Sequence, residues 1–237
     1  MKLTEKAIAI SEKIEKSYNI IITSHISPDG DAIGSMLGLF YFIKKQYNKK
    51  AKMFINGGIN HNLRFLEGID EIQKYDDMMM EEIIGADLIF VLDLNDLNRL
   101  KEAGDAVAMS NAYKILIDHH VEPKKFADLE LIDTEATSTG ELIWRLIDKL
   151  KGKFDNRISN ALYTAIMTDT GSFRFERTNS QTHNIVAQLI DNGADPVNCY
   201  DEIYNQKTVQ ALKLLGLSLT KIDLFADGRI AIMSIHK

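Results

Sequence analysis

The chain has 237 residues, of which 45% are hydrophobic and 26% charged, and its formal net charge at pH 7 is −6. This length allows one large α/β domain, or one domain with a small additional lobe, and the composition is that of an ordinary globular protein. The acidic balance excludes a protein built to grip long duplex nucleic acid, because such proteins neutralise phosphates with clustered basic side chains and this chain has only pairs such as Lys124-Lys125.

Along the chain, apolar β-branched runs alternate with amphipathic or apolar segments of helical length. We predict strands at residues 20–24, 52–55, 86–93, 112–118 and 129–133. We predict helices at residues 3–17, 31–47, 96–103, 138–150, 157–168, 181–192, 196–204 and 207–218, with irregular helical structure over 60–84. Strands that alternate with helices indicate an α/β fold, with a mainly parallel sheet flanked by helices on both faces.

The last part of the chain has a different pattern. Residues 221–225 and 229–235 are apolar runs separated by Ala-Asp-Gly, which is typical of a β-hairpin. A lone two-stranded hairpin is only marginally stable in water. We therefore expect residues 1–205 to form the main domain, and residues 206–237 to be a linker helix and the start of a second, truncated domain.

Two features bear on the location of the protein. The longest uncharged run, residues 32–43, is shorter than the roughly 20 residues that a membrane span needs, and the N-terminus opens an amphipathic helix rather than a signal peptide. The single cysteine, Cys199, excludes an internal disulfide and fits a reducing compartment. We expect a cytoplasmic protein with no contact to a membrane.

Acidic and imidazole side chains follow three of the predicted strands and one helix. They are His25, Asp29 and Asp31 after the first strand, Asp93 and then Asp118, His119 and His120 at two later strand ends, and Asp169 at the end of helix 157–168. Open α/β sheets bind ligands at the carboxyl ends of their strands. Taken alone, Asp29 and Asp31 also fit turn or helix-capping positions, and His25 fits a histidine satisfied at a strand end.

Carboxylate and imidazole ligands without thiolates suit Mn²⁺ or Mg²⁺, or alternatively Zn²⁺ or Co²⁺. The candidates are too many for one ion, and two cations roughly 3.5–4 Å apart form a clamp for displacement at phosphorus. One carboxylate must then bridge the pair. We choose Asp93, because it ends the strand between the other two ligand loops.

Four motifs in this order resemble the signature of the DHH phosphoesterase family. They are His25-x-x-Pro28-Asp29-Gly30-Asp31, Leu92-Asp93 with Arg99, Asp118-His119-His120, and Thr168-Asp169-Thr170-Gly171. The resemblance covers roughly residues 15–215. The chain is most similar to the bacterial bifunctional oligoribonuclease and pAp phosphatase branch, on the stretches 170–175 and 192–195.

The resemblance implies a phosphoesterase with two divalent cations, Mn²⁺ first and Mg²⁺ or Co²⁺ as alternatives. It implies that one ion is held by His25, Asp29 and Asp93, and the other by Asp31, Asp93, His119 and Asp169. His120 would face the substrate phosphate, and Asp118 would orient a ligand imidazole. A water bridging the ions would attack phosphorus as hydroxide.

Three further residues are expected to contact the substrate. Arg174 and Arg99 would bind phosphate, while Ser35 and the amides near Gly34 at the start of helix 31–47 would contact a phosphate oxygen. Arg177 is a weaker candidate for the same role. The alternative for all three arginines is an exposed, solvated cation.

The resemblance further implies the partners: short RNA or a small phosphorylated nucleotide such as 3′-phosphoadenosine 5′-phosphate (pAp), and a second copy in a homodimer. Polyphosphatase or pyrophosphatase activity and hydrolysis of linear or cyclic diadenylate are alternatives, and a nucleotide-binding regulatory module is the alternative without catalysis. Members of the family carry a following domain with a glycine-rich, histidine-containing loop, whereas the one Gly-Gly pair here is Gly57-Gly58. We therefore expect this stretch of chain to bind metal and to turn over substrate poorly.

Overall fold

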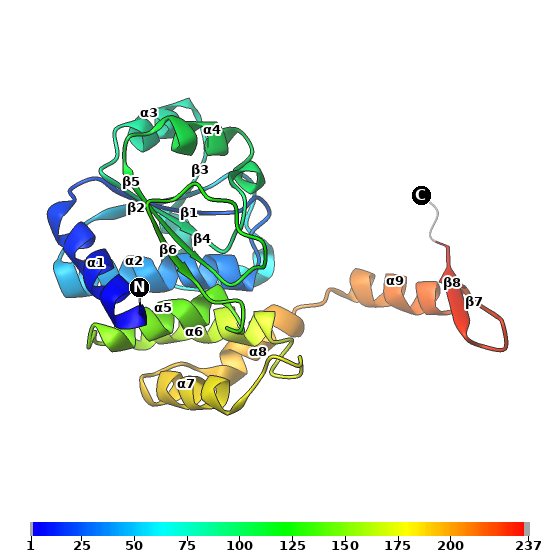
Figure 1. The fold of residues 1–237 in the computed structure, drawn as a ribbon. Coiled ribbons are helices and arrows are strands. Elements are labelled where there is room, and N and C mark those ends of the chain that lie inside the picture. Colours follow the sequence, from blue (N-terminus) through cyan, green and yellow to red (C-terminus); the bar gives the residue numbers. More distant parts are fainter. Residues whose placement is uncertain (1, 235–237) are drawn as a thin grey trace.

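The computed structural model describes residues 2–234, which form an α/β body and a projecting C-terminal arm (Figure 1). Within those residues the body contains a six-stranded, all-parallel sheet in the order β3-β2-β1-β4-β5-β6. The strands are β1 (Ile20–Ser24), β2 (Ala51–Ile55), β3 (Ile72–Lys74), β4 (Leu88–Leu92), β5 (Tyr113–Asp118) and β6 (Leu129–Ile132). The α/β prediction and its parallel sheet are confirmed.

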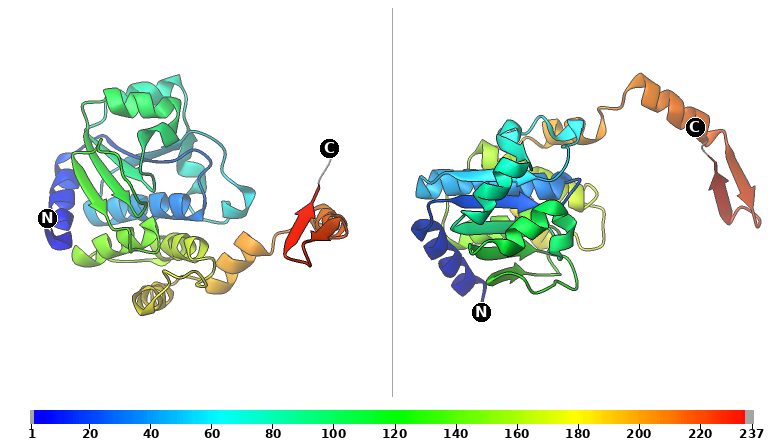
Figure 2. Two further views of the ribbon diagram at one scale, coloured as in Figure 1. Left: turned by 45° about the vertical axis from the view of Figure 1, so that its right-hand side comes forward. Right: turned by 90° about the horizontal axis from the view of Figure 1, so that it is seen from above.

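Helices cover both faces of this sheet (Figures 1 and 2). One face carries α1 (Leu3–Lys16), α2 (Gly30–Tyr47), α5 (Thr139–Lys149) and α6 (Asn156–Asp169). The other face carries α3 (Asp77–Ile84) and α4 (Glu102–Met109). Outside α6 lie α7 (Ser180–Asp191) and α8 (Pro196–Tyr204). Each face thus has its own apolar core, which explains why the central strands are apolar on both sides.

The chain reverses its direction of travel across the sheet between β1 and β4. The first three strands run outward as β1, β2 and β3, and the chain then returns to place β4 against the free side of β1. The register of β1 against β4 pairs Ser24 with Leu92, and the Ser24 hydroxyl donates a hydrogen bond to the Leu92 carbonyl over 2.8 Å. Ligands bind at such a switch point in open α/β sheets, just beyond the carboxyl ends of the strands.

Two predicted elements differ from the structure. Residues 60–84, predicted as irregular helical structure, contain two single 3-10 turns (His61–Leu63 and Ile69–Glu71) and α3, but also the edge strand β3, which was not predicted. In β3 one residue, Ile72, is buried, so this strand has no alternating pattern that a sequence reading could detect. The helix predicted at 96–103 is a 3-10 turn, Leu97–Leu100, that Lys101 separates from α4 by adopting a left-handed φ of 55°.

The arm consists of α9 (Val209–Leu219) and an antiparallel hairpin of β7 (Ile222–Phe225) and β8 (Ile230–Met233). Asp227 and Gly228 both have positive φ, as the Asp-Gly turn of a hairpin requires. The predicted hairpin is confirmed over these strands, and the predicted strand end at Ile235 lies outside the described residues. Within residues 2–234, no helix has both the length and the apolar character to span a bilayer.

Candidate metal centre

Three strand ends bring candidate ligands to the switch point. His25 follows β1, Asp93 follows β4, and His119 follows β5. Asp93 has a left-handed φ of 59° and its amide donates to the Ile117 carbonyl over 3.0 Å, so the chain leaves the strand sharply at this residue. Aspartate tolerates this conformation better than most residues.

Two helices add the remaining carboxylates. Asp29 is the N-cap of α2, and its Oδ1 accepts the amides of Asp31 and Ala32, each over 3.1 Å. Asp31, in the first turn, points inward and is only 1% exposed. Asp169 is the last residue of α6, which packs directly along α2. Asp29 therefore has the capping role of the alternative interpretation and, at the same time, a place beside the centre.

These side chains converge in three overlapping groups, in each of which the ligand atoms lie within 4.8 Å of one another. The groups are His25 with Asp29 and Asp93, Asp93 with His119 and His120, and Asp31 with His119 and Asp169. His25 Nε2 lies 3.4 Å from Asp93 Oδ2, and His119 Nε2 lies 3.2 Å from Asp169 Oδ2. All six predicted ligands are therefore together, with Asp93 shared between two groups.

The carboxylates repel one another strongly. Burial, together with the charges of Asp93 and Asp169, raises the pKa of Asp31 well above its ordinary value, and burial raises the pKa of Asp169 to about 6. In Asp93 burial opposes ionisation, but the contacts with His25, His119 and His120 hold its pKa below the ordinary value. Oxygen and nitrogen donors packed against unfavourable like charges fit divalent cations, which would remove the repulsion.

The N-terminus of α5 holds two of these carboxylates, a feature that the sequence analysis missed. The amides of Thr139 and Gly140 donate to the two oxygens of Asp31 over 2.7 and 2.8 Å, and the Thr139 hydroxyl donates to Asp93 Oδ1 over 3.0 Å. A helix N-terminus stabilises a carboxylate in this way. The available signal was Ser138-x-x-Glu141, which marks a helix start but not its target.

His119 and His120 differ in what fixes their rings. His119 Nδ1 lies 3.3 Å from the Ala136 carbonyl, an acceptor that places the proton on Nδ1 and directs Nε2 to the carboxylates. His120 Nδ1 lies 2.7 Å from Asp118 Oδ1. Asp118 thus orients His120, which belongs to the second group of candidate ligands, and not His119. His120 lies two residues beyond the end of β5, within hydrogen-bond distance of the Asp118 carboxylate.

Ser35 does not lie where the sequence analysis expected it. It is fully buried, and its hydroxyl donates to Asp31 Oδ1 over 3.2 Å, since residues four apart share a helix face. The expected contact of Ser35 with substrate is therefore wrong. Gly34 packs against α6, where a Cβ would overlap the Ala161 carbonyl, so it too faces away from solvent.

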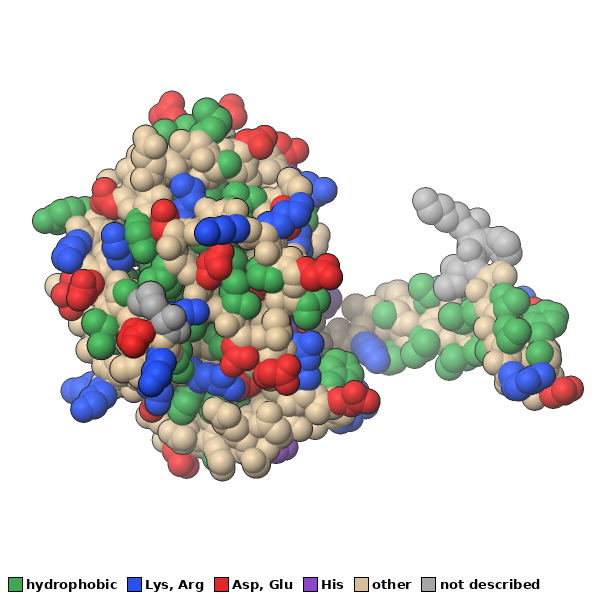
Figure 3. Space-filling model, viewed as in Figure 1, with side chains coloured by type: hydrophobic (Ala, Val, Ile, Leu, Met, Phe, Trp, Pro, Cys, Tyr) green, Lys and Arg blue, Asp and Glu red, His purple; other side chains and the backbone are tan. Residues whose placement is uncertain are grey.

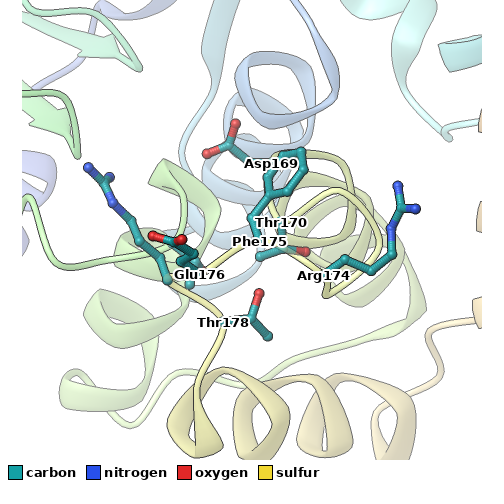
Figure 4. Close-up of a pocket in the computed structure, with 8 residues that line it drawn as sticks. Asp169, Thr170, Arg174, Phe175, Glu176 and Thr178 are labelled. Atoms are coloured by element: carbon teal, nitrogen blue, oxygen red, sulfur yellow. The ribbon is translucent and has the colours of Figure 1, made fainter. Parts of the chain in front are cut away.

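The predicted arginines lie near different ligands of the centre. Arg99 Nη1 lies 3.5 Å from the Asp93 carbonyl, beside the first group of ligands. Arg174 and Arg177 line a cavity of about 510 Å³ together with Asp169, Thr137, Thr170, Phe175, Glu176 and Thr178 (Figure 4). Because Asp169 belongs to both, the cavity opens directly beside the candidate metal centre.

Comparisons with known proteins agree with this geometry. Residues 19–170 match the model of the DHH family, N-terminal domain. Over 218 residues the chain is 29% identical to the bifunctional oligoribonuclease and PAP phosphatase NrnA of Bacillus subtilis, which covers 90% of this chain and 65% of that protein. The NrnA of Thermus thermophilus is 32% identical over 209 residues, covering 88% of this chain and 60% of that protein.

A solved structure has a similar fold over nearly the whole chain. The exopolyphosphatase-related protein of Bacteroides fragilis superposes with a TM-score of 0.91 at 32% identity, covering 98% of this chain and 69% of that one. The chain spans 60 to 65% of the length of the two NrnA proteins that it matches.

Proposed function

The chain belongs to the DHH family, and we propose that it is a two-metal phosphoesterase that hydrolyses short oligoribonucleotides, pAp, or both. The observation that carries this proposal is the convergence of His25, Asp29, Asp31, Asp93, His119 and Asp169 into one cluster, in which His25, Asp31, Asp93 and His119 are buried. Core packing gives no reason for four separate segments to bring these groups together and to bury four of them. The NrnA proteins that the chain resembles are named for this pair of activities.

The proposed ligand sets follow the family resemblance, and they contain two of the three groups of side chains. His25, Asp29 and Asp93 would hold one cation, and Asp31, Asp93, His119 and Asp169 the other, with Mn²⁺ as first choice and Mg²⁺ or Co²⁺ as alternatives. When bound, such a pair lowers the pKa of a water molecule and neutralises phosphate oxygens. We propose His119 rather than His120 as the ligand, because Nδ1 of His120 is already in contact with the Asp118 carboxylate.

The chain's own residues have three tasks in this proposal. The α5 N-terminus and Thr139 hold Asp31 and Asp93 in place, so that the site needs little rearrangement during the reaction. His120, held by Asp118 and partly exposed at the edge of the centre, would contact a phosphate oxygen. Arg99, beside Asp93, and Arg174, in the cavity that Asp169 also lines, would bind further phosphate oxygens.

The remaining parts of the proposal rest on the sequence and on the family. We propose that residues 1–205 are the catalytic domain, with residues 206–237 serving as a linker helix and part of a second domain. From the family resemblance we also propose a homodimer. We propose that it acts in the cytoplasm, because Cys199 is the only cysteine of the chain, which fits a reducing compartment.

Hydrolysis of polyphosphate or pyrophosphate is a second candidate. It is favoured by the similarity to the exopolyphosphatase-related protein, and the same cluster of ligands would serve it. The deciding assay compares Mn²⁺-dependent release of product from pAp, a 5′-phosphorylated diribonucleotide, pyrophosphate and polyphosphate. Faster release from pAp and the diribonucleotide would support the proposal. Faster release from pyrophosphate and polyphosphate would instead support the second candidate.

The matched variant for this assay is Asp93→Asn, because asparagine has the same shape and also tolerates the left-handed φ of Asp93. We expect it to lose both turnover and binding of one or both Mn²⁺ ions by titration calorimetry. The exposed Asp223→Asn, on the arm, is the control and should change neither. Full activity of Asp93→Asn, or no metal-dependent release by the unmodified protein from any of the four substrates, would contradict a two-metal phosphoesterase.

A further inference from the structure

The loop after α6 is wound tightly and held by many hydrogen bonds. Gly171, Ser172 and Phe173 have successive positive φ values of 56°, 59° and 64°. The Ser172 amide donates to the Met167 carbonyl over 2.8 Å, and the amides of Arg174 and Phe175 both donate to the Thr170 carbonyl. Two consecutive non-glycine residues in the left-handed region are unfavourable, and such conformations cluster at binding sites.

This winding directs the two phenylalanines of the loop to opposite sides. The Phe173 ring packs inward against Tyr163 and His183, with ring centroids 6.0 and 5.7 Å apart. Phe175 points outward into the cavity beside the metal centre and is 58% exposed (Figure 4). The first ring therefore anchors the loop, and the second contributes little to the core.

Phe175 is nevertheless held in place. Its ring lies against the backbone of Gly171, where an added Cβ would come within 2.5 Å of the ring's Cζ. One side of the ring is thus covered by glycine while more than half of the residue stays open to water. A large apolar ring fixed in this exposed position gains little from burial, so its placement points to a ligand.

The cavity around the ring has polar groups suited to a phosphorylated ligand. Arg174 and Arg177 supply guanidinium groups, and the buried hydroxyl of Thr178 has no hydrogen-bond partner among residues 2–234. Figure 4 shows Asp169 of the metal centre on the same side as the Phe175 ring. A volume of about 510 Å³ is within the usual range for a small-molecule site.

We propose that this cavity is a nucleobase subsite in which Phe175 is the stacking surface, so that the centre acts on nucleotides rather than on inorganic phosphate chains. The inference rests on the proposed function and deepens it. A base has an aromatic face that stacks on Phe175 while the arginines bind an adjoining phosphate, and stacking of this kind tolerates every base. Pyrophosphate and polyphosphate have no such face and would leave the ring in contact with water.

The test compares Phe175→Leu, which keeps an apolar side chain without the ring, with Phe175→Tyr, which keeps the ring. Substrates are pAp and its abasic analogue, ribose 3,5-bisphosphate. Stacking energies predict that Phe175→Leu raises the KM for pAp by about 5- to 30-fold, with kcat and the KM for the analogue nearly unchanged. Phe175→Tyr should behave as the unmodified protein. Tyr18→Leu, an 83% exposed aromatic before β1, is the matched control and should change nothing.

A second readout separates this inference from the proposed function. Binding of AMP and of ribose 5-phosphate is measured by calorimetry, and Mn²⁺ affinity confirms that the centre is intact. If Phe175→Leu weakens the binding of AMP but not of ribose 5-phosphate, the result supports the subsite. This holds even if the unmodified protein hydrolyses no nucleotide, a result that would refute only the proposed function. Equal effects on nucleotide and abasic ligands, or no effect on either, would overturn the subsite whether or not pAp is hydrolysed.

Discussion

Asp93 is the residue on which the candidate centre depends most. It lies at the end of β4, beside His25 on one side and His119 on the other, and it is only 2% exposed. Its carboxylate is fixed by the Thr139 hydroxyl from a helix that begins 46 residues later in the chain. Groups that orient metal ligands typically affect metal affinity almost as strongly as the ligands themselves.

We predict that Thr139→Val lowers Mn²⁺ affinity by about 10-fold or more, because it removes the hydroxyl that orients Asp93 while keeping the shape of the side chain. Thr139→Ser restores a hydroxyl and should recover most of the affinity. Calorimetric titration with Mn²⁺ measures the effect, and melting in the presence of a chelator checks the fold. If the valine variant binds as tightly as the unmodified protein, the orienting role of Thr139 is wrong.

At the scale of elements, the close approach of α2 to α6 brings Asp169 to Asp31. Gly30, Gly34 and Gly38 lie four residues apart on one face of α2, and at each of them a Cβ would overlap an atom of α6. The overlapping atoms belong to Thr168, Ala161 and Leu162. The absence of side chains on this face lets the two backbones meet and places the end of α6 beside the start of α2.

Gly34→Ala should therefore destabilise the body by about 1–3 kcal/mol, the usual cost of overfilling a packed interface, despite the better helix propensity of alanine. Gly216→Ala is the matched control, because Gly216 is also helical and has no atom within 4 Å of its added Cβ. Urea unfolding monitored by circular dichroism measures both variants. An unchanged unfolding midpoint for Gly34→Ala would contradict the close contact of α2 and α6.

The contact of α6 with α8 protects the single cysteine. Cys199 is fully buried, its Sγ lies 3.6 Å from Asn160 Oδ1, and burial raises the pKa of the thiol to about 11. The thiolate is the reactive form, and a thiol with this pKa is only about 0.1% ionised at pH 8.

We predict that a thiol reagent such as dithionitrobenzoate reacts with folded Cys199 at pH 8 far more slowly than with the unfolded chain. Raising the pH should also destabilise the body, because the folded state holds the thiol proton more tightly than the unfolded state does. That contribution is complete below pH 9 and is lost as the pH rises through about 11. Rapid labelling of the native protein at pH 8 would show that α8 does not cover the cysteine.

At the scale of the whole molecule, the arm stands apart from the body. Figures 1 and 2 show α9 and its hairpin extending beyond α8, and Figure 3 shows hydrophobic side chains along the arm. Leu212, Leu215 and Leu217 of α9 and Leu224 and Ile232 of the hairpin are all about half exposed or more. The arm therefore has little apolar burial of its own, whereas the body has a core on each face of its sheet.

Limited proteolysis tests this division. Exposed segments with few packed contacts open most readily, so trypsin should cut first after Lys207, Lys213 or Lys221 and leave a folded body. Mass spectrometry locates the cuts, and the body should keep its melting temperature and its response to Mn²⁺. First cuts inside residues 20–169, or loss of cooperative melting after the arm is removed, would contradict an independently stable body.

Local patterns in the chain were sufficient to predict most of the architecture and most of the side chains that converge at the candidate site. Strand and helix periods identified five of the six strands in the body's sheet as described over residues 2–234, and Asp93, His119 and Asp169 were chosen as metal-type ligands at the ends of elements. Residue type and position at an element's end are local properties, so they can be read without knowing the packing.

Only the tertiary structure decided which partners these groups have. The pairing of β1 with β4, the donation from α5 to Asp31 and the burial of Ser35 behind that carboxylate all follow from packing. The same is true of Phe175, whose exposed position depends on the winding of its loop and on Gly171. Contacts between segments up to about a hundred residues apart depend on how helices and sheet fit together, and no local pattern records that fit.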